Sequence, residues 1–208
     1  MAICEKMVYM SFLLDVLNHK EVYSMHIQAT KQVLDFWNIN PIEKNTDGDI
    51  FAWHANFEMV NRKKLLILMH DMTRFCVLVY GVKKSDRKTL TRIIKDAMYV
   101  TMKSEAYSGF TIKAYLDHFD EVSFGRTKNR KYISRIVWMR DYVLSYMEEH
   151  GVYMDTHEQP QITTIVNDLL VTDDDYKTWY QPNSAMIGIL EDYENTMVGY
   201  DLENDKFF

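Results

Sequence analysis

The stretch from residue 51 to residue 82, FAWHANFEMVNRKKLLILMHDMTRFCVLVYGV, restricts the fold of this chain more than any other. It begins with apolar and polar residues in alternation, which is the two-residue period of a strand with one apolar face. Two runs that follow, LLILMH and FCVLVYG, are largely apolar on both faces, as expected for central strands that are covered on both sides. The pattern predicts three strands, at about 50–56, 64–70 and 75–80, joined by short turns.

Periodicity and capping residues predict the elements on either side of these strands. The expected elements are a short helix at 7–17, a strand at 25–30 with a helix after it, helices at 85–104 and 108–119, a strand at 121–127, a helix at 129–150, and two smaller helices near 161–170 and 182–194. The sequence therefore predicts an α+β fold, a small, mainly antiparallel sheet packed against several helices.

Length and charge suggest how the chain is divided. With 208 residues, of which 47% are hydrophobic, it is long enough for one buried core and too short to promise two. Residues 1–150 hold 22 Lys and Arg against 18 Asp and Glu, whereas residues 151–208 hold 2 against 12. We divide the chain into an N-terminal helical appendage or over-extended start (1–24), a core α+β domain (25–150), and an acidic C-terminal helical extension that packs on the core and has a frayed end (151–208).

Several classes of protein and site are disfavoured. The two cysteines, Cys4 and Cys76, lie far apart and outside any CxxC motif, which favours a reducing cytoplasm over a disulfide framework or a Cys-based zinc site. We expect no membrane span and no signal peptide, because no apolar run is long enough and no cleavage site follows residues 7–14. The seven histidines lack metal-binding spacing, and no nucleotide-fold or nucleophile-elbow motif occurs. We therefore expect no metal and no cofactor.

Two segments, FAWHANFEMVNRKKLLILMHDMTRFCVLVYGV and FGRTKNRKYISRIVWM, resemble an uncharacterised domain family of bacterial and phage proteins. The likeness covers about residues 25–145 and rests on a W-H-A-N segment, an R-x-x-L-L-x-x-x-x-D-x-T-R-F segment that starts at Arg62, and a T-x-N-R segment that opens a helix. The positions that carry it are Trp53, His54, Ala55, Asn56, Asp71, Thr73, Arg74, Phe75, Thr127, Asn129 and Arg130. The resemblance implies a compact domain that starts near Met25 and has a prokaryotic or phage origin. It implies no reaction.

The segment GRTKNR, residues 125–130, combines a helix start with basic side chains. The first turn of a helix presents unpaired N–H groups and a partial positive charge, which favour a bound anion. Arg126, Lys128 and Arg130 lie in this segment and Lys131 follows it directly. A guanidinium can hold a phosphate or carboxylate through two parallel hydrogen bonds. The segment predicts an anion pocket. The alternative is that Asn129 caps the helix and the basic residues are solvated.

A second candidate cluster lies on the first two strands of the hairpin. If the strands pair through a turn around Met59–Arg62, we expect His54 and Asn56 on one face, with His70 nearby. A histidine and an asparagine together can orient a polar ligand, and histidine can move a proton near neutral pH. The alternative is that His54 and Asn56 bond to neighbouring backbone in a half-buried strand.

The turn HDMTRF, residues 70–75, also has two interpretations. Asp71 at the start of a tight turn, with Thr73 two residues later, is common turn chemistry, and Arg74 would then pair with Asp71. In the other interpretation, Arg74 is a second clamp for the anion. We assign Trp138 to the core.

Together these segments predict a non-catalytic binding protein with a basic and polar pocket for an anionic ligand, such as a phosphorylated compound or a nucleotide. The candidate ligand-binding residues are Trp53, His54, Asn56, Arg62, His70, Asp71, Thr73, Arg74, Arg126, Thr127, Lys128, Asn129 and Arg130.

Two other classes of function stay open. One is a protein-interaction module, a phage or mobile-element factor that binds a host protein through the acidic tail and through Trp179, Tyr180, Phe207 and Phe208. The other is an enzyme that acts on phosphoesters, with His54 or His70 as acid or base. Sequence-specific DNA binding is not favoured, because the net charge is −6 and no recognition-helix motif is present.

Overall fold

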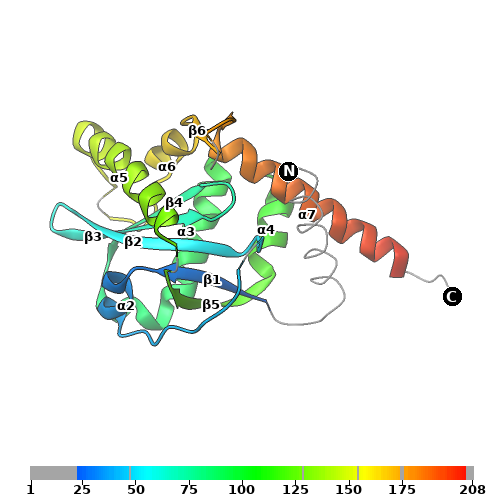
Figure 1. The fold of residues 1–208 in the computed structure, drawn as a ribbon, viewed down its shortest axis with the longest axis horizontal. Coiled ribbons are helices and arrows are strands. Elements are labelled where there is room, and N and C mark those ends of the chain that lie inside the picture. The colour runs from blue at the N-terminus through cyan, green and yellow to red at the C-terminus, as the bar shows by residue number, and fades with distance from the viewer. Residues whose placement is uncertain (1–22, 47, 128, 154, 174–175, 205–208) are drawn as a thin grey trace.

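Helices cover both faces of a five-stranded sheet in the computed structural model, which describes residues 23–46, 48–127, 129–153, 155–173 and 176–204 (Figure 1). The elements in chain order are β1 (Tyr23–Ala29), α2 (Lys31–Trp37), β2 (Ala52–Val60), β3 (Lys63–His70), β4 (Cys76–Val82), the 3-10 helix η1 (Lys84–Thr89), α3 (Leu90–Ser104), α4 (Gly109–Asp117), β5 (Phe119–Arg126), α5 (Arg130–His150), α6 (Pro160–Asn167), β6 (Val171–Thr172), β7 (Trp179–Tyr180) and α7 (Pro182–Asn204). The predicted α+β class is confirmed. The helix expected at 7–17 lies outside the described residues. Within the described ranges, no helix has the length and apolar character needed to span a bilayer.

The sheet has the strand order β4-β3-β2-β1-β5. Strands β2, β3 and β4 form the predicted antiparallel unit, and β1 lies parallel to both β2 and β5. The five-stranded sheet is thus mixed, where the sequence led us to expect a mainly antiparallel one. The reason is that α2 connects β1 to β2, and a crossover through a helix returns the chain in the same direction.

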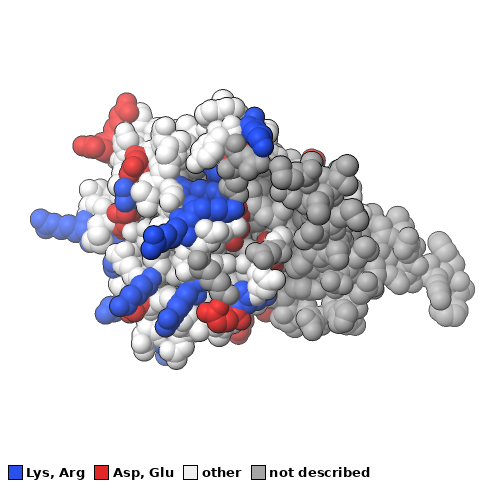
Figure 2. Space-filling model, in the orientation of Figure 1, with Lys and Arg blue, Asp and Glu red and all other residues white. Residues whose placement is uncertain are grey.

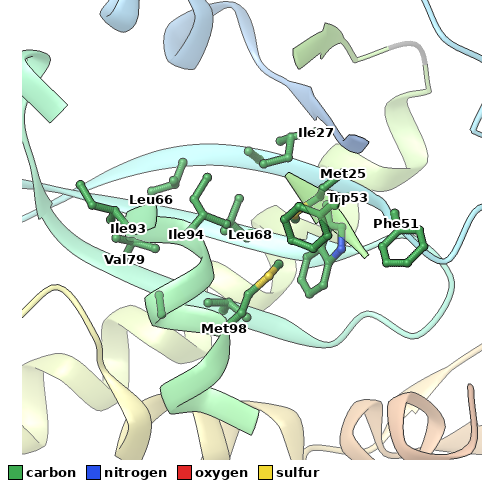
Figure 3. Close-up of a cluster of buried hydrophobic side chains, with 14 of the residues drawn as sticks. Met25, Ile27, Phe51, Trp53, Leu66, Leu68, Val79, Ile93, Ile94 and Met98 are labelled. Atoms are coloured by element: carbon green, nitrogen blue, oxygen red, sulfur yellow. The ribbon is translucent and has the colours of Figure 1, made fainter. Parts of the chain in front are cut away.

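Two apolar cores lie on opposite faces of this sheet, because successive side chains of a strand point to opposite faces. The larger core packs one face of the sheet against α2, α3, α4 and α7. Figure 3 shows Ile94 and Met98 of α3 beside Leu68 and Trp53 in this core. The smaller core packs β3 and β4 against α5 and α6 on the other face.

The face that lies under α5 is apolar on β3 and β4 but polar on β1 and β2. On β1, the His26 ring bonds to Ser123 and Gln28 donates to Thr46. On β2, the even-numbered side chains His54 and Asn56 occupy this face, because their odd-numbered neighbours belong to the larger core on the other side. The sequence alternation in the first strand of the hairpin is therefore what places polar groups beneath the start of α5.

Two tight turns set the register of the hairpin strands. Asn61 and Arg62 join β2 to β3, and both have positive φ (49° and 63°), as a two-residue hairpin turn requires. The predicted connection around Met59–Arg62 is confirmed. The second turn runs from His70, whose N–H donates to the carbonyl of Phe75 at 2.8 Å, and contains Arg74 at a φ of 61°. A positive φ is unusual for a bulky residue, so this turn holds Arg74 in a strained conformation.

The C-terminal part adds two helices and a short two-stranded sheet. The predicted helices near 161–170 and 182–194 are found as α6 and α7. Met186, Leu190 and Tyr193 of α7 enter the larger core. The Tyr107 hydroxyl donates to the carbonyl of Asn183, also on α7. The last four residues, 205–208, lie outside the described part of the chain.

Candidate functional site

A buried histidine and a buried aspartate form the centre of the polar face. His54 of β2 lies directly across from Met69 of β3. Its Nδ1 is 2.5 Å from Oδ1 of Asp71, and both side chains are buried. A carboxylate can only accept, so Nδ1 carries the proton and Nε2 is left as an acceptor when the ring is neutral. No described residue forms a hydrogen bond with this Nε2.

The first turns of α5 lie over this pair. The Tyr132 ring stacks on the His54 ring, with 4.2 Å between ring centroids and 18° between ring planes. The Arg135 guanidinium lies 5.1 Å from the centre of the same Tyr132 ring, and its Nη1 donates to the Asp71 carbonyl at 3.3 Å. The Asn129 cap begins the helix at this point, since its Oδ1 accepts from the Lys131 N–H at 3.0 Å. The sheet, the turn and the helix are therefore joined at Asp71.

Arg74 lies close enough to Arg135 for its positive charge to act on the Arg135 guanidinium. Burial lowers the pKa of Arg135 below its usual range, and the positive charge of Arg74 lowers it further. Both arginines also act on the Tyr180 hydroxyl of β7, where burial raises the pKa and the two positive charges oppose that rise. Two neighbouring cations in a half-buried place repel each other, and a bound anion would relieve that repulsion.

The side chains of Arg74 and Arg135 line a cavity of about 650 Å³ between α5 and the β6–β7 segment. Its floor includes Met69 of β3, the cross-strand neighbour of His54. Figure 2 shows Lys and Arg side chains gathered in the middle of this face of the molecule, near the start of α5. The cationic lining residues are Arg74, Lys131 and Arg135; the aromatic ones are Trp138, Tyr176 and Trp179; Asp173 is the acidic one among the described residues. A cavity of this size and lining can enclose a small anionic molecule.

The model of the family Domain of unknown function (DUF6933) matches residues 26–185 of the chain. The chain belongs to this family. The matched region contains every described residue of the cavity and extends further than the segments by which the sequence resembles an uncharacterised family. No curated protein matches the chain.

The structure of this DUF6933 domain brings two predicted site residues together, His54 and Asp71, and places a third, Arg74, in the same turn as Asp71. Asp71 pairs with His54, whereas one interpretation of the turn sequence predicts Arg74 as its partner. Asn56 lies on the same face as His54 and accepts a hydrogen bond from Thr30. The HDMTRF segment is a tight turn, as the first interpretation predicts, and its Arg74 lines the cavity. The role of Arg74 as a clamp for an anion stays a prediction.

His70 does not join this group, and the expectation that it lies near His54 is wrong. In the observed register His70 is directly across from Trp53, so it lies on the opposite face of the sheet. Its ring bonds to Thr73 and to the Ile50 carbonyl, and burial lowers its pKa to about 4. Trp53 and Thr73 are likewise buried, with the Trp53 Nε1 donating to Tyr115. These three side chains serve the packing of the core.

The remaining predicted residues are spread over the surface. Arg62 lies at the tip of the β2–β3 hairpin, in a separate hollow with Lys63 and Lys64. Arg126 and Arg130 are exposed. Thr127 has a buried hydroxyl for which the described part of the chain offers no hydrogen-bond partner. Lys128 lies outside the described residues, as do Phe207 and Phe208, so the interaction through the acidic tail stays a prediction.

Sequence reasoning missed Tyr132, Arg135 and Tyr176, and it offered Trp179 as a residue that contacts a partner protein rather than as part of a cavity. The assignment of Trp138 to the core is wrong, because its side chain is 42% exposed and lines the cavity. A signal was available: Lys131, Arg135 and Trp138 recur at helical spacing on the stripe of α5 that is not apolar. That stripe begins directly after the GRTKNR segment, so the basic side chains continue along the helix rather than ending at its cap.

Proposed function

We propose that this DUF6933 domain is a binding protein that takes an anionic small molecule into the cavity between α5 and the β6–β7 segment. The observation that carries the proposal is the convergence of Arg74 and Arg135 on one half-buried cavity. Guanidinium groups bind phosphate and carboxylate through paired hydrogen bonds, and partial burial strengthens such contacts by removing competing water.

The way each arginine is held also supports this proposal. Arg135 lies over the Tyr132 ring and donates to the Asp71 carbonyl, so its position is set before any ligand arrives. Arg74 is held by a turn at positive φ. Conformational strain of this kind tends to persist at binding sites, where the surrounding structure overrides local preference. Lys131, one turn before Arg135 on α5, adds a third positive charge.

Isothermal titration with inorganic pyrophosphate tests the proposal. We expect Arg135→Ala and Arg74→Ala each to weaken binding by about tenfold or more, because a charge-assisted hydrogen bond to the anion is lost. The matched control is Arg87→Ala, which removes an exposed arginine outside the cavity and should leave binding unchanged. Thermal melting of each variant checks that the fold is retained. Pyrophosphate binding that is equally strong in the parent and both variants contradicts the proposal.

A second candidate function is hydrolysis of a phosphoester, which the His54–Asp71 pair favours. A carboxylate on Nδ1 leaves Nε2 able to accept a proton from water, as in many acid–base catalysts. Tyr132 covers the His54 ring, however, so catalysis requires this tyrosine to move. The test is phosphate release from a panel of phosphoesters. Turnover that persists in His54→Ala, or a parent protein with no turnover, contradicts this function.

We further propose that the protein acts in a cytoplasm, in a bacterial or phage context. The absence of a CxxC motif and the distance between the two cysteines in the sequence support a reducing compartment. Cys76 is buried and its thiol donates to the Arg74 carbonyl, so it stabilises the turn as a thiol.

A further inference from the structure

We propose that the anion is part of a nucleotide, with its phosphate at Arg74 and Arg135 and its planar base against the indole rings of Trp138 and Trp179. This inference rests on the proposed function, since it names the ligand class of the same cavity. Three observations carry it: the order of side chains along α5, the exposure of the aromatic residues, and the position of the Asp173 carboxylate.

The α5 wall of the cavity changes from cationic to aromatic along the helix axis. Lys131 and Arg135 come first, and Trp138 follows on the same side. Because an α-helix rises 1.5 Å per residue, Trp138 lies about 4.5 Å beyond Arg135 and about 10 Å beyond Lys131 along the axis. A ligand that uses both ends of this wall must carry its negative charge at one end and a flat apolar group at the other. A nucleotide has that shape.

The aromatic side chains of the cavity are exposed to an unusual extent. Trp179 is 65% exposed and Tyr176 is 81% exposed, and Trp138 lies across the cavity on α5. Large aromatic side chains that are exposed beside a cavity commonly mark a binding surface. An indole ring can stack on any nucleic-acid base, because every base has a flat π-face. Trp138 of α5 and Trp179 of β7 line the same cavity, so both indole rings are available to a ligand inside it.

The carboxylate of Asp173 makes a ligand that also carries hydroxyl groups a better fit to the cavity than a bare anion such as phosphate or pyrophosphate. Asp173 lines the cavity, and its Oδ1 accepts from the Lys177 N–H at 2.8 Å, which holds the group in place. A carboxylate repels a phosphate but accepts hydrogen bonds from sugar hydroxyls. A ligand with a neutral, hydroxyl-bearing part between its phosphate and its ring fits a cavity that contains both arginines and this aspartate.

The experiment compares two probes that share a phosphorylated sugar and differ in the base, adenosine 5′-monophosphate and ribose 5-phosphate, by isothermal titration of the full chain. We expect the nucleotide to bind about tenfold or more tightly than the sugar phosphate, since stacking adds to the phosphate contact. Trp179→Ala should remove this advantage while leaving affinity for ribose 5-phosphate unchanged. The control Tyr99→Ala removes an exposed aromatic ring of α3 outside the cavity and should change neither affinity.

Each other outcome overturns the inference, and the outcomes separate it from the proposed function. Equal affinity for the two probes, with both weakened by Arg135→Ala, shows an anion site that does not select a base, so the proposed function survives alone. A nucleotide advantage that Trp179→Ala leaves intact places the base elsewhere and contradicts the assignment to this wall. Binding of neither probe, or binding that Arg135→Ala leaves unchanged, overturns the inference and the proposed function together.

Discussion

The Glu105 side chain has surroundings that are unusual for a carboxylate. Glu105, at the end of α3, is buried, and its Oε1 accepts from Asn167 of α6 at 3.4 Å. Asn167 also bonds to both backbone groups of Cys76 on β4. Burial raises the pKa of Glu105 to about 7, and the neighbouring Asp168 contributes to the rise. This carboxyl therefore carries its proton in part at neutral pH.

The raised pKa of Glu105 predicts a dependence of stability on pH. The folded protein binds this proton more tightly than the unfolded chain, whose pKa is near the ordinary 4.5, so the free energy of unfolding falls as pH rises from about 4.5 to about 7. Glu105→Gln keeps a neutral group and should remove this decline, with a gain at pH 8 on the order of 1 to 2 kcal/mol. Urea unfolding at pH 5 and pH 8 measures it. A variant whose stability changes with pH as the parent's does would contradict the assignment.

The turns between strands are the elements in which local sequence and structure conflict. Asn61 suits the positive φ that it adopts, but Arg62 next to it does not. Asn-Gly is the pair that a two-residue hairpin turn favours most. Arg62 lies in the hollow at the hairpin tip, outside the cavity that we assign to the ligand. Its strain can therefore be removed without touching that cavity.

Arg62→Gly should stabilise the protein by about 0.5 to 1 kcal/mol, because glycine takes a positive φ without steric cost. Thermal melting measures the change, and the affinity for pyrophosphate should stay as in the parent. The control is Arg87→Gly in η1, which should destabilise the protein. At that position glycine relieves no backbone strain and only increases the conformational entropy of the unfolded chain. A lower melting temperature for Arg62→Gly would show that the arginine side chain matters at the hairpin tip.

At the level of the complete fold, the C-terminal segment is built into the core. The β6–β7 segment forms one wall of the cavity, and α7 places Met186, Leu190 and Tyr193 among side chains from the sheet and α4. Figure 1 shows α7 leaving the β6–β7 end of the molecule and running past α4. An acidic segment can still have a packed inner surface, because Glu191 and Asp192 are exposed between the buried Leu190 and Tyr193.

Leu190→Ala should lower the free energy of unfolding by about 2 to 4 kcal/mol. The Leu190 side chain is fully buried, and the surrounding side chains fill the space that it leaves only in part. Ile165→Ala on α6 is the matched control, because its side chain is partly exposed and its loss should cost much less. Urea unfolding compares the two variants. Equal and small losses would mean that α7 is not part of the cooperative core.

Local patterns in the chain were enough to predict the hairpin strands, the helix that Asn129 caps, and the turn that holds Arg74, because strand alternation, capping and turn chemistry depend on neighbours in sequence. To predict which face of the sheet His70 occupies, the strand register had to be known. A two-residue turn pairs even-numbered with odd-numbered residues, so His54 lies opposite Met69 rather than beside His70.

The cavity depended on tertiary packing. Arg74, Arg135 and Trp179 lie far apart in sequence, on a turn, a helix and a short strand, and they meet because α5 and the β6–β7 segment pack on the same face of the sheet. Periodicity shows which stripe of a helix is apolar, but not which distant segment will cover the polar stripe next to it. The sequence therefore determined the α5 helix and the turn that holds Arg74, and the folded chain determined that these two elements and the β6–β7 segment enclose a common space.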